Sequence, residues 1–211
     1  MIEPNIQNYI EQFSTEPPKY LKDLEKETYQ KTVLPQMISG SYQGRLLSLI
    51  SKLKHPENIL EIGTFTGYAT LCLAEGLRAN GLVHTIDIND EFRYLQDKYF
   101  EISGYKNRIK QYFGNALEII PEMDLSFDLV FLDADKKKYP EYLNIILPKI
   151  KKGGILLADN VLWYGKVVDT QARDAETSGI KKFNEQVKNH PDLEGVILPV
   201  RDGISVWIKK N

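Results

Sequence analysis

In NILEIGTFTG, residues 58–67, a short apolar run ends in a loop with two glycines, and this junction is the clearest indication of how the chain folds. Four further apolar runs follow, and helical segments of one to four turns separate them. Strands that alternate with helices are typical of parallel βαβ units, in which both faces of the sheet are covered. The four runs are LVHTID at 82–87, RIKQYF at 108–113, FDLVFLD at 127–133 and GILLAD at 154–159.

The two ends of the chain depart from this pattern. Apolar residues recur at helical spacing over 5–13, about 18–32 and 41–53, which predicts an N-terminal helical extension over residues 1–55. Near the other end, GVILPV and ISVWIKK are joined by RDG, which predicts an antiparallel hairpin at one edge of the sheet. We therefore expect one domain over residues 1–211, with a doubly wound, mostly parallel, Rossmann-like seven-stranded α/β sheet.

Composition excludes several classes of protein. Of 211 residues, 42% are hydrophobic and 27% charged, which is typical of a globular chain. The net charge of −2 supplies no overall cationic field for nucleic acid or an anionic membrane. No apolar run approaches the roughly 20 residues of a membrane span, and the acidic, amphipathic N-terminus is unlike a signal peptide. With a single cysteine, Cys72, the expected location is the cytoplasm.

Acidic side chains occur at the carboxyl ends of four of the five predicted parallel strands. These ends meet at one edge of an open parallel sheet, and ligands bind there. A scattered surface acid would explain any one of them, but not the whole set. The four are Glu61, Asp87, Asp133 and Asp159.

The loop after the first strand separates two kinds of cofactor. Its glycines, Gly63 and Gly67, are spaced G-x-x-x-G, whereas dinucleotide-binding loops use G-x-G-x-x-G to approach a pyrophosphate. The spacing favours a ligand with adenosine and amino-acid parts and no phosphate. Asp87 could accept hydrogen bonds from ribose hydroxyls, or cap a helix that begins near Asp90. Gly63 could allow the backbone to approach the ligand, or be a simple turn glycine.

Asp133, Asp159 and Asn160 form a set of hard oxygen ligands. No cysteine or histidine occurs in these motifs, which argues against zinc and copper. Two carboxylates and an amide suit Mg²⁺, Mn²⁺ or Ca²⁺. The alternative for Asp159 and Asn160 is a polar turn after a strand.

LEIGTFTGYAT at 60–70 resembles the first motif of class I S-adenosylmethionine-dependent methyltransferases. The motifs DADK at 133–136 and DNVLW-x-G-x-V at 159–167 more narrowly resemble the cation-dependent O-methyltransferases typified by catechol and caffeoyl-CoA O-methyltransferases. The resemblance implies S-adenosylmethionine and a divalent cation as cofactors, with magnesium first and manganese or calcium as alternatives. It also implies methyl transfer to a vicinal-oxygen, catechol-like small aromatic.

The resemblance further assigns individual residues. Some positions depart from many relatives, which have serine at Ala69 and aspartate at Asn115. The implied metal ligands are Asp133, Asp159 and Asn160. The implied cofactor contacts are Met37 and Ser39 at the methionine part, Glu61, Gly63, Thr64 and Ala69 in the first loop, Asp87 at the ribose, Ala116 at the adenine, and Asp133 near the methyl donor.

Lys136 resembles the family's lysine that takes or orients the proton of the substrate hydroxyl. A lysine can act as a base only if its pKa falls, and burial and a nearby cation would both lower it. Lys137 and Lys138 are expected to be solvated. Trp163 could line the acceptor pocket or pack in the interior.

Two other functions remain as alternatives. Some bacterial relatives methylate a hydroxylated uridine in transfer RNA, and the lysine clusters at 136–138 and 149–152 could contact phosphates. The acidic net charge and the absence of an appended RNA-binding domain argue against this acceptor. A non-catalytic dinucleotide-binding module is disfavoured by the glycine spacing and the intact oxygen ligands. The resemblance also implies a homodimer, and the N-terminal helices could supply part of its interface.

Overall fold

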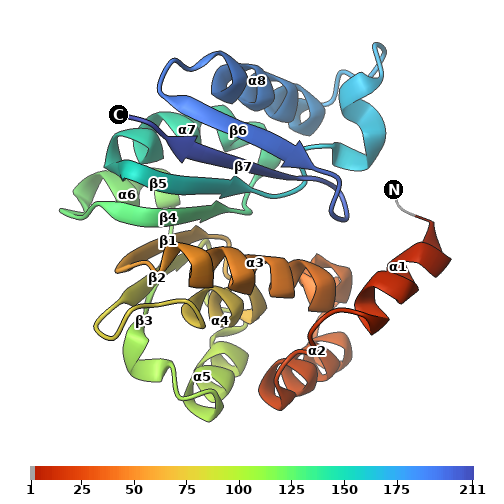
Figure 1. The fold of residues 1–211 in the computed structure, drawn as a ribbon, viewed down its shortest axis with the longest axis vertical. Helices are drawn as coiled ribbons and strands as arrows, with labels where there is room; N and C mark the ends of the chain where they lie inside the picture. Colours follow the sequence, from red (N-terminus) through yellow and green to blue (C-terminus); the bar gives the residue numbers. More distant parts are fainter. Residues whose placement is uncertain (1–2) are drawn as a thin grey trace.

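The computed structural model describes residues 3–211, and over this range a seven-stranded sheet in the order β3-β2-β1-β4-β5-β7-β6 forms the centre of the molecule (Figure 1). The first five strands pair in parallel, and β7 pairs antiparallel with both β5 and β6. The predicted parallel sheet with a C-terminal hairpin is confirmed. The strands are β1 (Asn58–Ile62), β2 (Leu82–Asp87), β3 (Ile109–Phe113), β4 (Phe127–Leu132), β5 (Ile150–Ala158), β6 (Leu193–Leu198) and β7 (Ile204–Lys209).

Helices cover both faces of this sheet. One hydrophobic core contains residues of α2, α3, α4 and α5, and a second contains residues of α6, α7 and α8. The central strand β4 contributes to both, because successive side chains of a strand point to opposite faces. The helices are α1 (Pro4–Gln12), α2 (Lys19–Lys31), α3 (Gly40–Lys54), α4 (Tyr68–Ala74), α5 (Arg93–Ile102), α6 (Ala116–Glu122), α7 (Tyr139–Ile146) and α8 (Ala175–Asn189).

The alternation in β4 can be followed residue by residue. Val130 and Leu132 belong to the core under α6, α7 and α8, whereas Leu129 and Phe131 belong to the opposite core. All six residues of β4 are buried. The strand is apolar apart from Asp128, whose carboxylate accepts hydrogen bonds from the Glu57 and Asn58 N–H groups, and this nearly continuous run is why the sequence pattern located the strand well.

The structure also differs from the sequence expectations. Helix α8 was not predicted, although its buried residues Thr177, Ile180, Phe183 and Val187 recur at helical spacing. Its N-terminus is capped by Asp174, whose side chain accepts a hydrogen bond from the Thr177 backbone N–H. Strand β5 begins four residues earlier than expected, and α4 ends five residues earlier than the segment 67–79.

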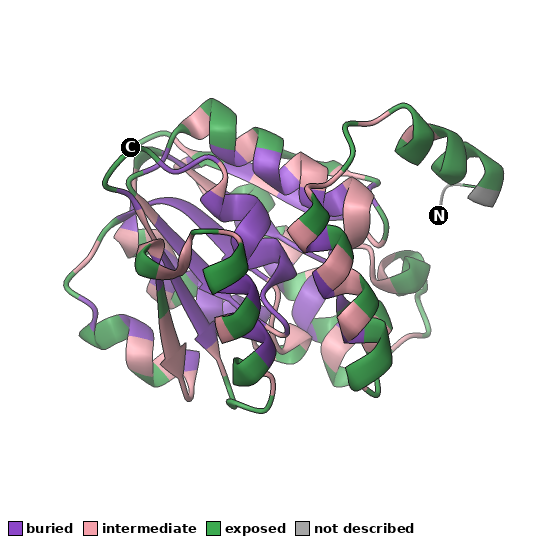
Figure 2. Cartoon of the chain, turned by 90° about the horizontal axis from the view of Figure 1, so that it is seen from below, coloured by how far each residue is buried: buried purple, intermediate pink, exposed green. Residues whose placement is uncertain are grey.

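The N-terminal helix α1 lies apart from the body of the molecule and is largely exposed (Figure 2). By contrast, Leu21 and Leu24 of α2 and Leu47 of α3 are fully buried in the core. The N-terminal extension thus divides into an exposed first helix and two helices that complete the fold. Within the described residues, no helix is both long and apolar enough to cross a membrane.

Candidate active site

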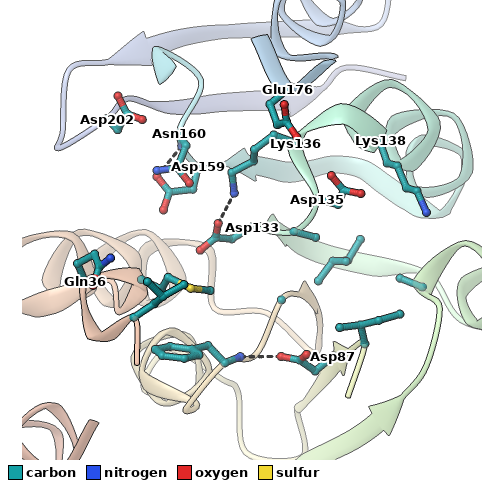
Figure 3. A pocket seen from close by; sticks show the side chains of 18 of the residues that line it. Gln36, Asp87, Asp133, Asp135, Lys136, Lys138, Asp159, Asn160, Glu176 and Asp202 are labelled. Carbon is teal, nitrogen blue, oxygen red and sulfur yellow. Dashed lines mark hydrogen bonds and ion pairs between the residues drawn. The ribbon is translucent and has the colours of Figure 1, made fainter. Parts of the chain in front are cut away.

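A pocket of about 1560 Å³ lies at the carboxyl ends of the parallel strands (Figure 3). Every loop that follows one of the five parallel strands contributes to its wall. The connection between α2 and α3 and residues Trp163 and Tyr164 line it as well. Among the residues predicted from the sequence, those that line the pocket are Met37, Gly63, Asp87, Ala116, Asp133, Lys136, Asp159 and Asn160.

Gly63 is required by its neighbour on the next strand. Its φ is +102°, and a Cβ atom at this position would lie 1.8 Å from the carbonyl oxygen of Asp133. The two strand ends are joined here, because the Asp133 N–H donates to the Ile62 carbonyl at 2.8 Å. Close approach between β1 and β4 therefore explains this glycine, and approach to a ligand remains a prediction.

Asp87 fixes the loop that follows β1. Its Oδ2 accepts hydrogen bonds from the backbone N–H groups of Thr64 (3.1 Å) and Phe65 (2.8 Å). Within residues 3–211, its Oδ1 accepts a single long bond, from the Asn89 N–H at 3.4 Å, so it retains capacity for a ligand hydroxyl. Helix α5 begins at Arg93 with Phe92 as its N-cap, so Asp87 does not cap it.

Four predicted cofactor contacts lie behind the pocket wall. Glu61 is fully buried, and its Oε2 accepts hydrogen bonds from Thr70 and Thr85. Burial raises the pKa of Glu61 to about 8, so the carboxyl carries a proton at neutral pH. Ser39, Thr64 and Ala69 are also buried and are absent from the pocket lining. Direct contact of these four residues with a cofactor stays a prediction.

Lys136 and Asp133 form an ion pair inside the pocket, with Lys136 Nζ 2.6 Å from Asp133 Oδ1 (Figure 3). Burial by itself would lower the pKa of Lys136, but the negative charge of Asp133, with smaller contributions from Tyr139 and Asp159, outweighs it. The net effect raises the pKa of Lys136 above its usual range. Lys136 paired in this way is an ammonium group, which is the opposite of what a base requires.

Asp159 lies beside Asp133, because their strands β4 and β5 are paired neighbours in the sheet. Its Oδ2 accepts a hydrogen bond from Gln43 Nε2 at 2.6 Å, and its Oδ1 accepts one from the Asn160 N–H at 2.7 Å. Burial raises the pKa of Asp159, and the charge of Asp133 raises it further. Asn160 follows with φ of +58°, a left-handed conformation that asparagine tolerates better than most residues.

Sequence reasoning missed three residues of this site. Gln43 is fully buried and holds Asp159 from 116 positions away, so no local pattern could reveal the contact. Arg201 and Asp202 lie in the β6–β7 turn and both line the pocket. The turn itself was predicted from RDG, but its proximity to the strand ends was not. Trp163, for which two roles were considered, lies on the pocket wall.

Comparison with known proteins gives a consistent result. Residues 11–210 match the O-methyltransferase family. The catechol O-methyltransferase of Niastella koreensis is 30% identical over 84% of each chain. Caffeoyl-CoA O-methyltransferase 2 of Petunia hybrida is 32% identical over 90% of this chain and 83% of its own.

Solved structures agree with the sequence comparisons. The O-methyltransferase TomG of Streptomyces achromogenes, determined with S-adenosylmethionine, superposes with a TM-score of 0.91 at 28% identity, and the match covers all of both chains. The Bacillus cereus O-methyltransferase, determined with S-adenosylhomocysteine, has a TM-score of 0.90 at 27% identity over 98% of this chain and 97% of its own. With its pocket at the strand ends and these matches along nearly its whole length, the chain belongs to the O-methyltransferase family and is an S-adenosylmethionine-dependent enzyme.

Proposed function

We propose that this enzyme transfers a methyl group to a hydroxyl of a small aromatic with vicinal oxygens, in a reaction that depends on a divalent cation. The observation that carries the proposal is that the ends of β4 and β5 bring Asp133, Asp159 and Asn160 to one wall of the pocket (Figure 3). Relatives that are catechol and caffeoyl-CoA O-methyltransferases support this class of acceptor.

The donor set fits a hard cation. Within residues 3–211, no group of three or more His, Cys, Asp or Glu side chains could hold a metal ion. The candidate set has two carboxylates, and its third ligand is the amide of Asn160. Mg²⁺ commonly uses one or two carboxylates and leaves its other positions to water and substrate. Burial and the charge of Asp133 raise the pKa of Asp159. A positive charge between the two carboxylates would counteract both effects and lower this pKa.

The pocket wall supports an aromatic acceptor rather than a polyanion. Apolar and aromatic side chains line part of the pocket, among them Met37, Tyr42, Trp163 and Tyr164. Eight carboxyl groups line the whole pocket against three cationic side chains, and one of the three, Lys136, is paired with Asp133. A lining of this charge repels phosphates, so the pocket does not favour transfer RNA.

Different residues of the pocket would have different roles in the reaction. S-adenosylmethionine supplies the methyl group, and a bound divalent cation would make a chelated hydroxyl more acidic. Asp87 would accept hydrogen bonds from the ribose through its underused Oδ1. Asp133, Asp159 and Asn160 would hold the cation, and Gln43 would hold the Asp159 carboxylate in position. The pocket would thereby align the acceptor oxygen with the methyl group.

Lys136 would take or orient the acceptor proton. As an ammonium it can donate hydrogen bonds to the attacking oxygen. To act as a base it must first lose its proton, which the ion pair with Asp133 opposes. If Asp133 also bound a cation, its carboxylate would stabilise the Lys136 ammonium less, and the pKa of Lys136 would fall. The base role therefore depends on metal loading.

The test measures methyl transfer from labelled S-adenosylmethionine to a panel of catechols and, in parallel, to bulk transfer RNA. We expect transfer to catechols, loss of activity in excess chelator, and recovery with Mg²⁺ or Mn²⁺. Full activity with chelator and negligible metal content would refute the cation requirement. Transfer to RNA but to no catechol would refute the acceptor class.

We also propose a homodimer and a cytoplasmic location. Ile6 and Tyr9 of helix α1 and its C-cap residue Phe13 are exposed, recur at helical spacing and form an apolar face. Light scattering should report the mass of two chains, and replacement of Tyr9 and Phe13 by serine should reduce it to one. A wild-type mass of one chain would contradict the dimer.

A further inference from the structure

The connection between α2 and α3, residues 32–39, forms one edge of the pocket but has few contacts of its own. Val33 is 93% exposed and Met37 54% exposed, although both line the pocket. Ile38 is the buried apolar side chain of this connection. Its internal backbone hydrogen bonds are Met37 N–H to Leu34 and Ile38 N–H to Pro35, both 3.1 Å. A segment with so little packing opens easily unless something else holds it.

Arg201 holds this connection from the far end of the chain. Its Nη1 donates to the carbonyls of Ile38 (2.7 Å) and Ser39 (2.5 Å), and its Nη2 donates to the carbonyl of Gln36 (3.1 Å). Among the described turns and loops, no backbone N–H donates to the carbonyls of Gln36 or Ile38. One guanidinium therefore satisfies acceptors that the local backbone leaves without a partner.

The β6–β7 turn that carries Arg201 is itself firmly held. The Val161 N–H donates to the Gly203 carbonyl at 3.1 Å, and the Leu162 N–H donates to the Asp202 carbonyl at 2.9 Å. The Asp202 side chain accepts a further bond from the Tyr164 N–H at 2.6 Å. The turn is thus joined to the segment that directly follows Asp159 and Asn160, so Arg201 projects from a fixed base.

A second contact connects Arg201 to the carboxylate centre. Its Nη1 lies 3.4 Å from Gln43 Oε1, and Gln43 donates to Asp159 through its other amide atom at 2.6 Å. Gln43 is fully buried, so its amide has few alternative orientations. The guanidinium therefore contacts both the pocket edge and the side chain that orients Asp159.

We propose that Arg201 is a positioning residue that fastens the α2–α3 connection to the β6–β7 turn and so keeps the pocket edge, with Met37, closed over the cofactor. The proposal rests on the proposed cofactor pocket, but on neither the cation nor the acceptor. Loss of Arg201 would leave the connection to open and close freely, and part of the cofactor's binding energy would then be used to order it.

The decisive variant is Arg201→Gly. Arg201 has φ of +50°, which glycine adopts without strain, so relief of strain offsets the greater freedom that glycine gives the unfolded chain. We expect nearly unchanged thermal stability. Affinity for S-adenosylhomocysteine, measured by calorimetry, should fall about three- to tenfold, because the lost bonds involve a charged but solvent-exposed group. The KM for S-adenosylmethionine should rise by a similar factor, with a smaller change in kcat.

Two further variants complete the experiment. Arg201→Lys keeps the charge but offers one nitrogen instead of a fork, so its affinity should lie between wild type and Arg201→Gly. Arg173→Ala is the matched control, because Arg173 is exposed and its side chain donates only to the adjacent Ala172 carbonyl, at 3.4 Å. It should bind S-adenosylhomocysteine as wild type does.

Wild-type affinity in Arg201→Gly would overturn the proposal. A loss of affinity that only parallels a loss of thermal stability would overturn it as well, since a purely structural role predicts that pattern. Calorimetry with S-adenosylhomocysteine requires no acceptor and no metal. Failure of the proposed metal or acceptor chemistry would therefore appear separately, in the turnover assay.

Discussion

Replacement of Gly63 by alanine tests the close approach of β1 and β4 at the pocket. The new Cβ would lie 1.8 Å from the Asp133 carbonyl oxygen and 2.7 Å from its carbon, both backbone atoms that no side-chain rotation can move. The φ of +102° adds backbone strain of about 1–2 kcal/mol. Forced displacement of packed backbone costs about 1–3 kcal/mol more. We therefore expect a loss of about 2–5 kcal/mol in the free energy of unfolding.

The matched control is Gly104→Ala, because Gly104 also has a positive φ, +78°, but nothing lies within 4 Å of its Cβ position. It should lose only the strain, about 1 kcal/mol. Urea unfolding of both variants, followed by circular dichroism, measures the difference. Equal losses would show that strain alone matters and would refute the clash with Asp133.

Three further predictions concern Asp87, Lys136 and Glu61. Asp87→Ala should weaken S-adenosylmethionine binding by roughly 1.5–3 kcal/mol, the range for hydrogen bonds to a charged group; unchanged affinity in calorimetry would remove Asp87 from the site. Lys136→Ala should lower the single-turnover rate by about 10²–10⁴, and the loss should shrink at high pH and for more acidic hydroxyls; wild-type rates across pH would contradict the base role. Burial raises the pKa of Glu61 from 4.5 to about 8. Between these two pH values the folded state therefore binds a proton that the unfolded state has lost. This contribution to stability is complete below pH 4.5 and is lost as pH rises toward 8. Glu61→Gln should flatten the stability profile measured by urea titration, and an unchanged slope would show that Glu61 titrates normally.

Local sequence patterns are sufficient to predict the parallel sheet and the position of the pocket. The runs that became β1 and β4 are apolar over most of their length, because strands covered on both faces must be, and this signal is local. The acids Asp87, Asp133 and Asp159 follow three parallel strands, so topology alone places them at one edge. Helix α8 carries an equally local signal, the Asp174 cap and the spacing of Ile180, Phe183 and Val187.

The residues that contact those acids could be identified from the three-dimensional packing alone. Gln43 reaches Asp159 across 116 positions, and Arg201 reaches Ile38 across 163, distances over which sequence spacing carries no geometric information. The ion pair with Asp133 likewise keeps Lys136 charged. It raises the pKa of Lys136, whereas burial alone would lower it. Burial and charge pairing depend on where side chains meet in space, and they act on pKa in opposite directions. Their balance follows from the packed structure and from no pattern along the chain.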